Sequence, residues 1–213
     1  MMHIKNNLAC KKNIKKIFDM RIFFIILILI INFQSWTKAD DIKDFEIEGI
    51  SIGDSLLDFY NQDEIKEMYI ITYPKSKKYI KLGFRGNGKL NDYEHVTFHV
   101  KENDKRYIIH TINGVIFFEN KLDQCLKKKK EIVKDLSQTF TSLKPHDYEY
   151  AYQHAEKGSI AYITDFELND GSSLRVYCVN WTTYTEENKN YSDSLSISMS
   201  PKYFLDWLNN ESQ

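Results

Sequence analysis

Between Ser159 and Trp181 the chain reads SIAYITDFELNDGSSLRVYCVNW. The two arms of this stretch, Ser159–Leu168 and Ser173–Trp181, are rich in β-branched and aromatic residues, which favour strands. Asn169-Asp170-Gly171 lies between them, and Asp-Gly suits the positive φ angles of a tight turn. The sequence therefore predicts an antiparallel hairpin here.

A turn centred on Asp170 and Gly171 would gather five bulky side chains on one face of this hairpin. They are Tyr162, Phe166, Tyr177, Val179 and Trp181. Such a face either packs against a helix, for which the C-terminal helix is a candidate, or stays exposed and suits a ligand or a protein partner.

Further strands are predicted from alternation and from β-branched and aromatic composition. They are Tyr79–Arg85, Tyr93–Lys101, Arg106–Phe118 and Tyr191–Met199. Turns between the first three are expected at Gly86-Asn87-Gly88 and Glu102-Asn103-Asp104.

Three helices are predicted around these strands. Lys121–Leu143 has apolar residues at spacings of three and four, the pattern of an amphipathic helix. Gly53-Asp54-Ser55 indicates the start of a helix that ends near Met68, with Ser55 as its cap and Asp58 completing a capping box. Ser200-Pro201 opens a short last helix.

The predicted fold class is α+β, with the element order α-βββ-α-βββ-α. Hairpins dominate this order, so we expect an antiparallel, hairpin-rich sheet in a two-layer arrangement with the helices on one face.

Residues 1–39 have the three parts of a secretory signal peptide. Six basic residues and one acid precede an apolar run that begins at Ile22, and small residues precede a cut between Ala39 and Asp40. Even extended to Phe33, the run has 12 residues, whereas a membrane-spanning helix needs about 20. We therefore expect cleavage and no stable membrane anchor afterwards, with Met20 as an alternative start of the chain.

Cleavage leaves residues 40–213, which we expect to form a single mature α+β domain. This part has 22 Lys and Arg against 29 Asp and Glu, a net charge of −7. An acidic surface argues against nucleic acid as a partner. Together with a Lys-rich, Arg-poor composition typical of AT-rich bacterial genes, the leader indicates a periplasmic or secreted protein.

The start of the mature chain, ADDIKDFEIEGISIGDSLLDF (Ala39–Phe59), resembles that of a group of uncharacterised exported, periplasmic proteins from marine alphaproteobacteria. Tyr107–His110, Gly114–Phe118 and the two later cysteines carry the same resemblance, which spans most of the mature chain. It implies a location in a Gram-negative envelope and brings no activity with it.

Ile52–Asp58, IGDSLLD, is similar to the first block of the GDSL (SGNH) esterases, which makes Ser55 a candidate nucleophile. Such a serine needs a histidine base, an acid that orients it, and donors for the oxyanion. The family carries an Asp-x-x-His near its C-terminus, whereas Asp92–His95 here lies in a predicted strand soon after the serine. We favour a helix cap as the role of Ser55, with the serine esterase as an alternative.

His95, His99 and His110 form a second candidate site. If the turn centres on Asn103-Asp104, Thr97 faces His110, and all three imidazoles share the face of the hairpin that is not apolar. Three imidazoles can bind zinc or copper. We favour a polar outer face without metal, because surface clusters that lack supporting partners bind weakly, and keep a metal-binding module as an alternative.

Cys125 and Cys178 are predicted to form a disulfide. Cys10 leaves with the leader, and the remaining two cysteines enter a compartment that oxidises thiols. Cys125 belongs to the apolar stripe of its helix, and Cys178 shares a strand face with Leu174 and Val176, which that helix can cover.

These features predict an exported protein without enzymatic activity or cofactor, which binds a protein or a small envelope ligand. The partner's identity does not follow from the sequence.

Overall fold

The computed structural model describes residues 41–86, 89–153 and 157–212. The predicted signal peptide and its cleavage point between Ala39 and Asp40 lie outside these residues, as does most of the predicted Gly86-Asn87-Gly88 turn. No helix in the described part of the chain combines the length and the apolar character that crossing a bilayer requires.

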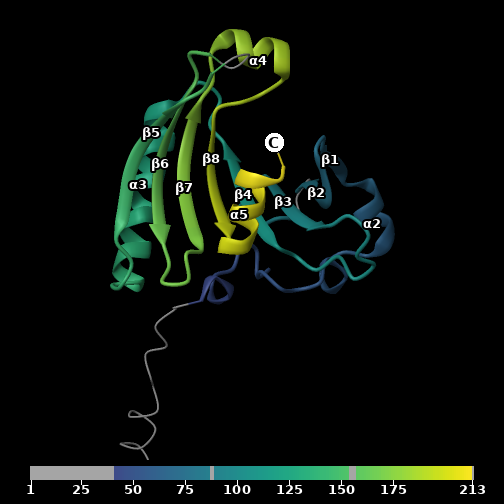
Figure 1. The fold of residues 1–213 in the computed structure, drawn as a ribbon. Helices are drawn as coiled ribbons and strands as arrows, with labels where there is room; N and C mark the ends of the chain where they lie inside the picture. Colours follow the sequence, from purple (N-terminus) through teal and green to yellow (C-terminus); the bar gives the residue numbers. More distant parts are fainter. Residues whose placement is uncertain (1–40, 87–88, 154–156, 213) are drawn as a thin grey trace, which may run out of the picture. The chain divides into compact units, whose positions relative to one another are not determined.

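Eight strands form one open antiparallel sheet, in the spatial order β1-β2-β3-β4-β8-β7-β6-β5 (Figure 1). Each half of the sheet is built from strands that pair with their neighbours in sequence, and the halves join where β4 pairs with β8. The strands are β1 (Tyr69–Tyr73), β2 (Ser76–Arg85), β3 (His95–Lys101), β4 (Thr111–Phe117), β5 (Pro145–Ala151), β6 (Ile160–Glu167), β7 (Ser173–Asn180) and β8 (Ser194–Ser200).

In the described part of the chain, four α-helices accompany the sheet. They are α2 (Gln62–Glu67), α3 (Leu122–Thr139), α4 (Thr183–Lys189) and α5 (Lys202–Asn210), and single 3-10 turns form at Ile42–Asp44 and Leu56–Asp58. The predicted helix from Gly53 to Met68 is thus broken into a 3-10 turn and α2. Asn61 begins α2 with a capping box that includes Glu64, and this local capping separates the two pieces.

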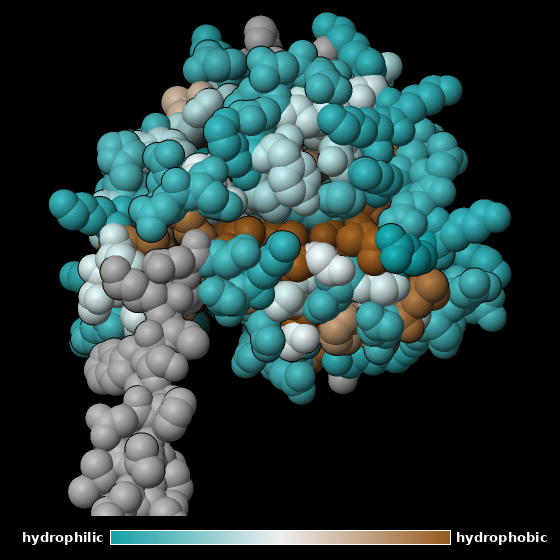
Figure 2. Space-filling view, turned by 60° about the horizontal axis from the view of Figure 1, so that its bottom comes forward, coloured by the Kyte–Doolittle hydropathy of each residue, from teal (hydrophilic) through white to brown (hydrophobic). Residues whose placement is uncertain are grey.

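Alternation along β3 separates the two faces of the sheet. Val96, Phe98 and Val100 are fully buried on one face, which we call the core face. The segment 42–68 covers this face together with the apolar side of α3, and both contribute to the main hydrophobic core. Figure 2 shows apolar residues as a narrow band between broad hydrophilic areas, as expected for a core layer seen at the end of the molecule.

His95, Thr97 and His99 belong to the opposite side of β3, which we call the open face. α5 covers one end of it, because Phe204 and Trp207 pack on Tyr79 with ring centroids 5.2 and 4.8 Å apart. α3 lies on the core face instead, where Cys125 meets Cys178. The helices therefore lie on both faces of the sheet (Figure 1), and the expectation that they share one face was wrong.

The element order also differs from the predicted one. β1 precedes the first three predicted strands, β5 forms in a stretch for which no strand was predicted, and α4 is inserted between β7 and β8. β1 and β5 are the two edges of the sheet, and most of their residues are exposed. An edge strand that is exposed on both sides has no apolar alternation to reveal it.

The predicted β6–β7 hairpin forms, but its register differs by one residue. Ile160 pairs with Asn180 and Phe166 with Leu174, because the loop has three residues, with Gly171 at φ +81°. Since a slip of one residue changes the face of every side chain, Tyr162 and Phe166 join the core face while Tyr177 and Val179 lie on the open face. The predicted single aromatic face was wrong.

Candidate functional site

His95 and His99 lie four residues apart along β3, and His110 lies beside His99, although not in the predicted register. Thr97 pairs with Asn113, and His99 pairs with Thr111, so His110 lies just before β4. The connection between β3 and β4 is longer than the predicted turn, and it contains Tyr107 at a positive φ of 50°. The prediction that Thr97 faces His110 was wrong for this reason.

Each of these histidines is hydrogen-bonded to a tyrosine. Three distances describe this arrangement: His95 Nε2 to Tyr69 Oη, 3.0 Å; His99 Nε2 to Tyr73 Oη, 2.6 Å; and His110 Nδ1 to Tyr203 Oη, 2.8 Å. The second nitrogen of His99 contacts Thr111 Oγ1 at 2.5 Å. Tyrosines from β1 and α5 therefore occupy one ring nitrogen of each histidine. The described residues contain no group of three His, Cys, Asp or Glu arranged to hold a metal ion.

Gly83 makes one of these pairs possible. The ring of Tyr69 lies over Gly83 so closely that a Cβ there would meet ring atoms at 2.0 Å. Glycine in a strand interior often marks such a close approach. The absent side chain allows Tyr69 to lie across β2 and reach His95 on β3.

Burial keeps two of these histidines neutral at ordinary pH. Burial first, and then the charges of Lys81 and Arg85, lower the pKa of His95 to about 4. Burial and then the charge of Lys81 lower the pKa of His99 to about 3. Neither imidazole is therefore a source of positive charge on the open face at neutral pH.

Ser55 lies outside this region. Its hydroxyl accepts a hydrogen bond from the Leu57 N–H at 3.2 Å and donates one to the Arg106 carbonyl at 2.5 Å. Asp58 makes no reciprocal capping contact, so the expected capping box is only half formed. The hydrogen bonds of Ser55 and His95 do not connect these two residues, which an esterase built on Asp92–His95 would need.

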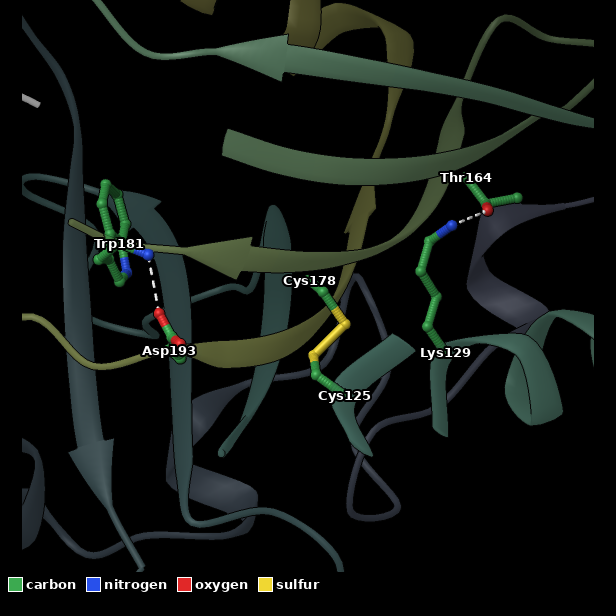
Figure 3. Close-up of a disulfide and its surroundings, with 6 residues drawn as sticks. All are labelled: Cys125, Lys129, Thr164, Cys178, Trp181 and Asp193. Atoms are coloured by element: carbon green, nitrogen blue, oxygen red, sulfur yellow. Dashed lines mark hydrogen bonds between the residues drawn. A yellow bond between two sulfur atoms is a disulfide. The ribbon is translucent and has the colours of Figure 1, made fainter. Parts of the chain in front are cut away.

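Cys125 of α3 and Cys178 of β7 lie at disulfide distance, with Sγ atoms 2.02 Å apart (Figure 3). Both cysteines are buried and form a small apolar cluster with Leu195. The link ties α3 to β7. Whether it forms in the exported protein stays a prediction.

The centre of the open face is a floor of small polar residues. Thr97, Thr111, Ser194 and Ser196 are buried there, and Asn113 and Ser198 pair across β4 and β8 beside them. Asn113 Oδ1 is buried without a hydrogen-bond partner among the described residues. A buried carbonyl oxygen without a partner is costly, which makes Asn113 an unusual residue of this floor.

Lys81 borders this floor. It pairs with His99 across β2 and β3, and burial lowers the pKa of its ammonium group. Arg175, on the other half of the open face, is bound instead to Asp165, with Nη2 and Oδ2 2.7 Å apart. Asp165 thus offsets the charge of Arg175, whereas Lys81 has no carboxylate partner among the described residues.

Aromatic side chains gather at the far end of the open face. The rings of Tyr150, Tyr152, Trp181 and Tyr191 form a continuous row, with neighbouring centroids 4.7 to 5.1 Å apart. The backbone N–H of Trp181 donates to Asp193 Oδ1 at 2.7 Å and fixes this end of the row (Figure 3). The connection that contains α4 therefore has a defined position against β7.

The sequence reasoning did not identify Lys81 or Asn113. The alternation of Ile80, Leu82 and Phe84 placed Lys81 on the outer face of its strand, where a lysine is ordinary. Its burial depends on β1, which the sequence did not reveal, and on β3. The apolar stretch around Asn113 was the available signal, because an amide within such a stretch is unusual.

Compared with protein family models, with curated proteins and with solved structures, the chain matches none of them.

Proposed function

We propose that this chain is an exported, non-enzymatic binding protein that holds a protein partner on the open face of its sheet. The position of its exposed hydrophobic residues carries this proposal. Seven of the ten large hydrophobic side chains that are exposed in the described residues belong to the open face or to the segments that border it: Tyr69, Ile71, Phe117, Tyr150, Tyr184, Tyr191 and Tyr203.

Five of these seven residues are tyrosines. Protein interfaces are enriched in tyrosine, because its ring supplies apolar contact area and its hydroxyl remains able to hydrogen-bond. The polar floor between them supplies donors and acceptors for recognition. A surface in which aromatic residues surround small polar ones suits a folded partner or an extended segment of one.

The location is argued from the leader and the cysteines. The basic and apolar parts of residues 1–39 are typical of secretion. The two cysteines of the mature chain lie at disulfide distance, and disulfides persist in oxidising compartments. These observations support a periplasmic or secreted protein.

Site-specific photo-crosslinking in the producing cell tests the proposal. A photoreactive phenylalanine analogue replaces Phe117 or Tyr191 on the open face, and Phe59 serves as the control because it is equally exposed, at 42% like Tyr191, in the segment that covers the core face. We expect the same partner to be captured from both open-face positions and not from Phe59. Capture from Phe59 alone, or from none of the three positions, would contradict the proposal.

A further inference from the structure

Lys81 is a cation whose charge nothing in the described structure offsets. It extends from the middle of β2 on the open face, between strands β1 and β3. No hydrogen bond or ion pair joins its ammonium group to the described residues, and burial alone accounts for its lowered pKa. Partly buried charges are normally paired, because desolvation without compensation is costly.

The protein pairs its other partly buried cations. Arg175 binds Asp165 through two nitrogens, Nε at 3.2 Å and Nη2 at 2.7 Å. Lys129 of α3 donates to Thr164 Oγ1 at 2.5 Å (Figure 3). Its Nζ also lies 3.5 Å from Asp147 Oδ1. Lys81 departs from this pattern in a fold that otherwise supplies such partners.

The surroundings of Lys81 add positive charge and no counter-ion. Arg85 lies four residues further along β2, on the same face, and is exposed. The charge of Lys81 reaches both His95 and His99, and it opposes their protonation. An anion that binds Lys81 would therefore be attracted by Arg85 as well. No carboxylate among the described residues is bonded to Lys81, so none would repel the anion from that position.

Asn113 supplies a second, complementary feature on the same face. Its Oδ1 is a buried acceptor without a donor. Lys81 pairs with His99, Asn113 pairs with Thr97, and these two partners are neighbours on one face of β3. Lys81 and Asn113 are thus two strands apart and offset by two residues along the strands, about 12 Å at ordinary strand spacing and rise, and the long lysine side chain can shorten that gap.

We propose that Lys81 receives an acidic residue of the partner on the open face. The side-chain carboxylate of an Asp or Glu accepts from the Lys81 ammonium, and Asn113 lies beside this contact on the same face. This inference rests on the proposed function, because it assigns the kind of residue that the partner brings to the open face. It adds the requirement that the partner be acidic at the point of contact.

The test uses a minimal mimic of that residue, N-acetyl-glutamate N-methylamide, which has one carboxylate and two peptide N–H groups. It is titrated into the ¹⁵N-labelled mature protein, purified after export, and followed by NMR at constant ionic strength, since salt screens such contacts. The neutral glutamine analogue and inorganic phosphate are the comparison ligands. Lys81→Met removes the charge at nearly constant length, and Lys128→Met, at an exposed lysine of α3, is the matched control.

We expect the glutamate mimic to shift the amide signals of Lys81, Thr97 and Asn113 saturably in the wild type and in Lys128→Met. Affinity should fall at least tenfold in Lys81→Met and for the glutamine analogue. Equal binding by Lys81→Met, equal binding of the glutamine analogue, or no saturable shift would overturn the assignment. Tighter binding of phosphate than of the mimic would also overturn the assignment, because the preferred ligand at Lys81 would then be a phosphate group and not an acidic residue.

These results separate the inference from the proposed function. If Phe117 and Tyr191 capture a partner while the mimic does not bind at Lys81, the binding face stands and the acidic contact fails. If the mimic binds at Lys81 while no partner is captured, the site is an anion site without a protein partner, and the assignment of its occupant is wrong.

Discussion

Lys81 of β2 lies directly opposite His99 of β3 on the open face of the sheet. The ammonium group has no partner of opposite charge among the described residues, and the imidazole is held neutral by burial and by that ammonium. The pair gives the β2–β3 part of the open face one positive charge that is not compensated within the described fold. This charge distinguishes the face from an ordinary polar sheet surface.

Removing the Lys81 charge should stabilise the folded protein. Lys81→Met keeps most of the apolar stem and eliminates an unpaired ammonium, so the free energy of unfolding should rise by about 0.5–2 kcal/mol. Lys128→Met on α3 should change it by less than about 0.5 kcal/mol. Urea denaturation measures both values. A clear loss of stability in Lys81→Met would mean that the ammonium has a structural partner.

The neutral histidines predict a pH dependence of stability. Both pKa values are lower in the folded state than the usual 6.5, at about 4 for His95 and about 3 for His99. The unfolded chain therefore binds more protons below pH 6.5, and the contribution of these groups to stability is lost as the pH falls from about 6.5 toward 4.

Each histidine can contribute at most about 1.4 kcal/mol per pH unit to that slope. His99→Gln should flatten the curve between pH 6 and 4, roughly, relative to the wild type. NMR titration of the His99 ring gives the direct check. A midpoint of His99 above pH 6 would show that the imidazole is solvated in solution.

The disulfide between Cys125 and Cys178 should form in the exported protein. The two residues are separated by 53 positions, and in the chain-entropy model a loop of this length stabilises the folded state by roughly 4 kcal/mol. Mass spectrometry of unreduced, alkylated protein from the envelope should show no free thiol. Two alkylated cysteines in that material would refute the bond, and a double Cys→Ser variant of normal stability would refute its importance.

Ser55→Ala should affect stability and no chemistry. The hydroxyl caps the turn at Leu56–Asp58 and bonds to the Arg106 carbonyl, so its loss should cost about 1 kcal/mol. A fluorophosphonate probe should leave Ser55 unlabelled in the native protein. Stoichiometric labelling of Ser55 would instead support the serine esterase.

The mature protein should begin within a few residues of Asp40. Residues 1–39 have the length and composition of a cleaved leader. Intact-mass analysis of protein recovered from the envelope measures the start directly. A mass that includes Ile22–Ile31 would show that the apolar segment is retained as an anchor.

Individual elements show how far the sequence could predict this fold. α3 was found because Leu122, Cys125 and Leu126 continue a spacing that only a helix satisfies. The β6–β7 hairpin was found from Asp170-Gly171, but its register depends on a third loop residue that turn composition does not specify. The local sequence pattern thus identified both strands, and the length of the loop between them decided which of their side chains share a face.

The candidate site was less predictable than the fold. For His95, His99 and His110 the sequence favoured a polar outer face, with a metal site as the alternative. It did not predict the tyrosine partner that the structure gives each of them: Tyr69 and Tyr73 lie in an edge strand that has no apolar alternation, and Tyr203 in the last helix. Lys81 becomes distinctive only after β1 and β3 enclose it. Non-local pairing creates the burial on which both features depend, and no local pattern encodes it.

The central claim is that the open face binds a protein. Calorimetry of the mature protein with the purified partner captured through Phe117 tests it most directly, with two double variants of matched chemistry. Phe117→Ser with Tyr191→Ser alters the open face, and Leu57→Ser with Phe59→Ser alters exposed side chains of the N-terminal segment. Because buried aromatic contacts dominate interface energies, we predict at least a tenfold loss of affinity, about 1.4 kcal/mol, for the first pair and little change for the second. Unchanged affinity in the first pair, or a larger loss in the second, would contradict the claim.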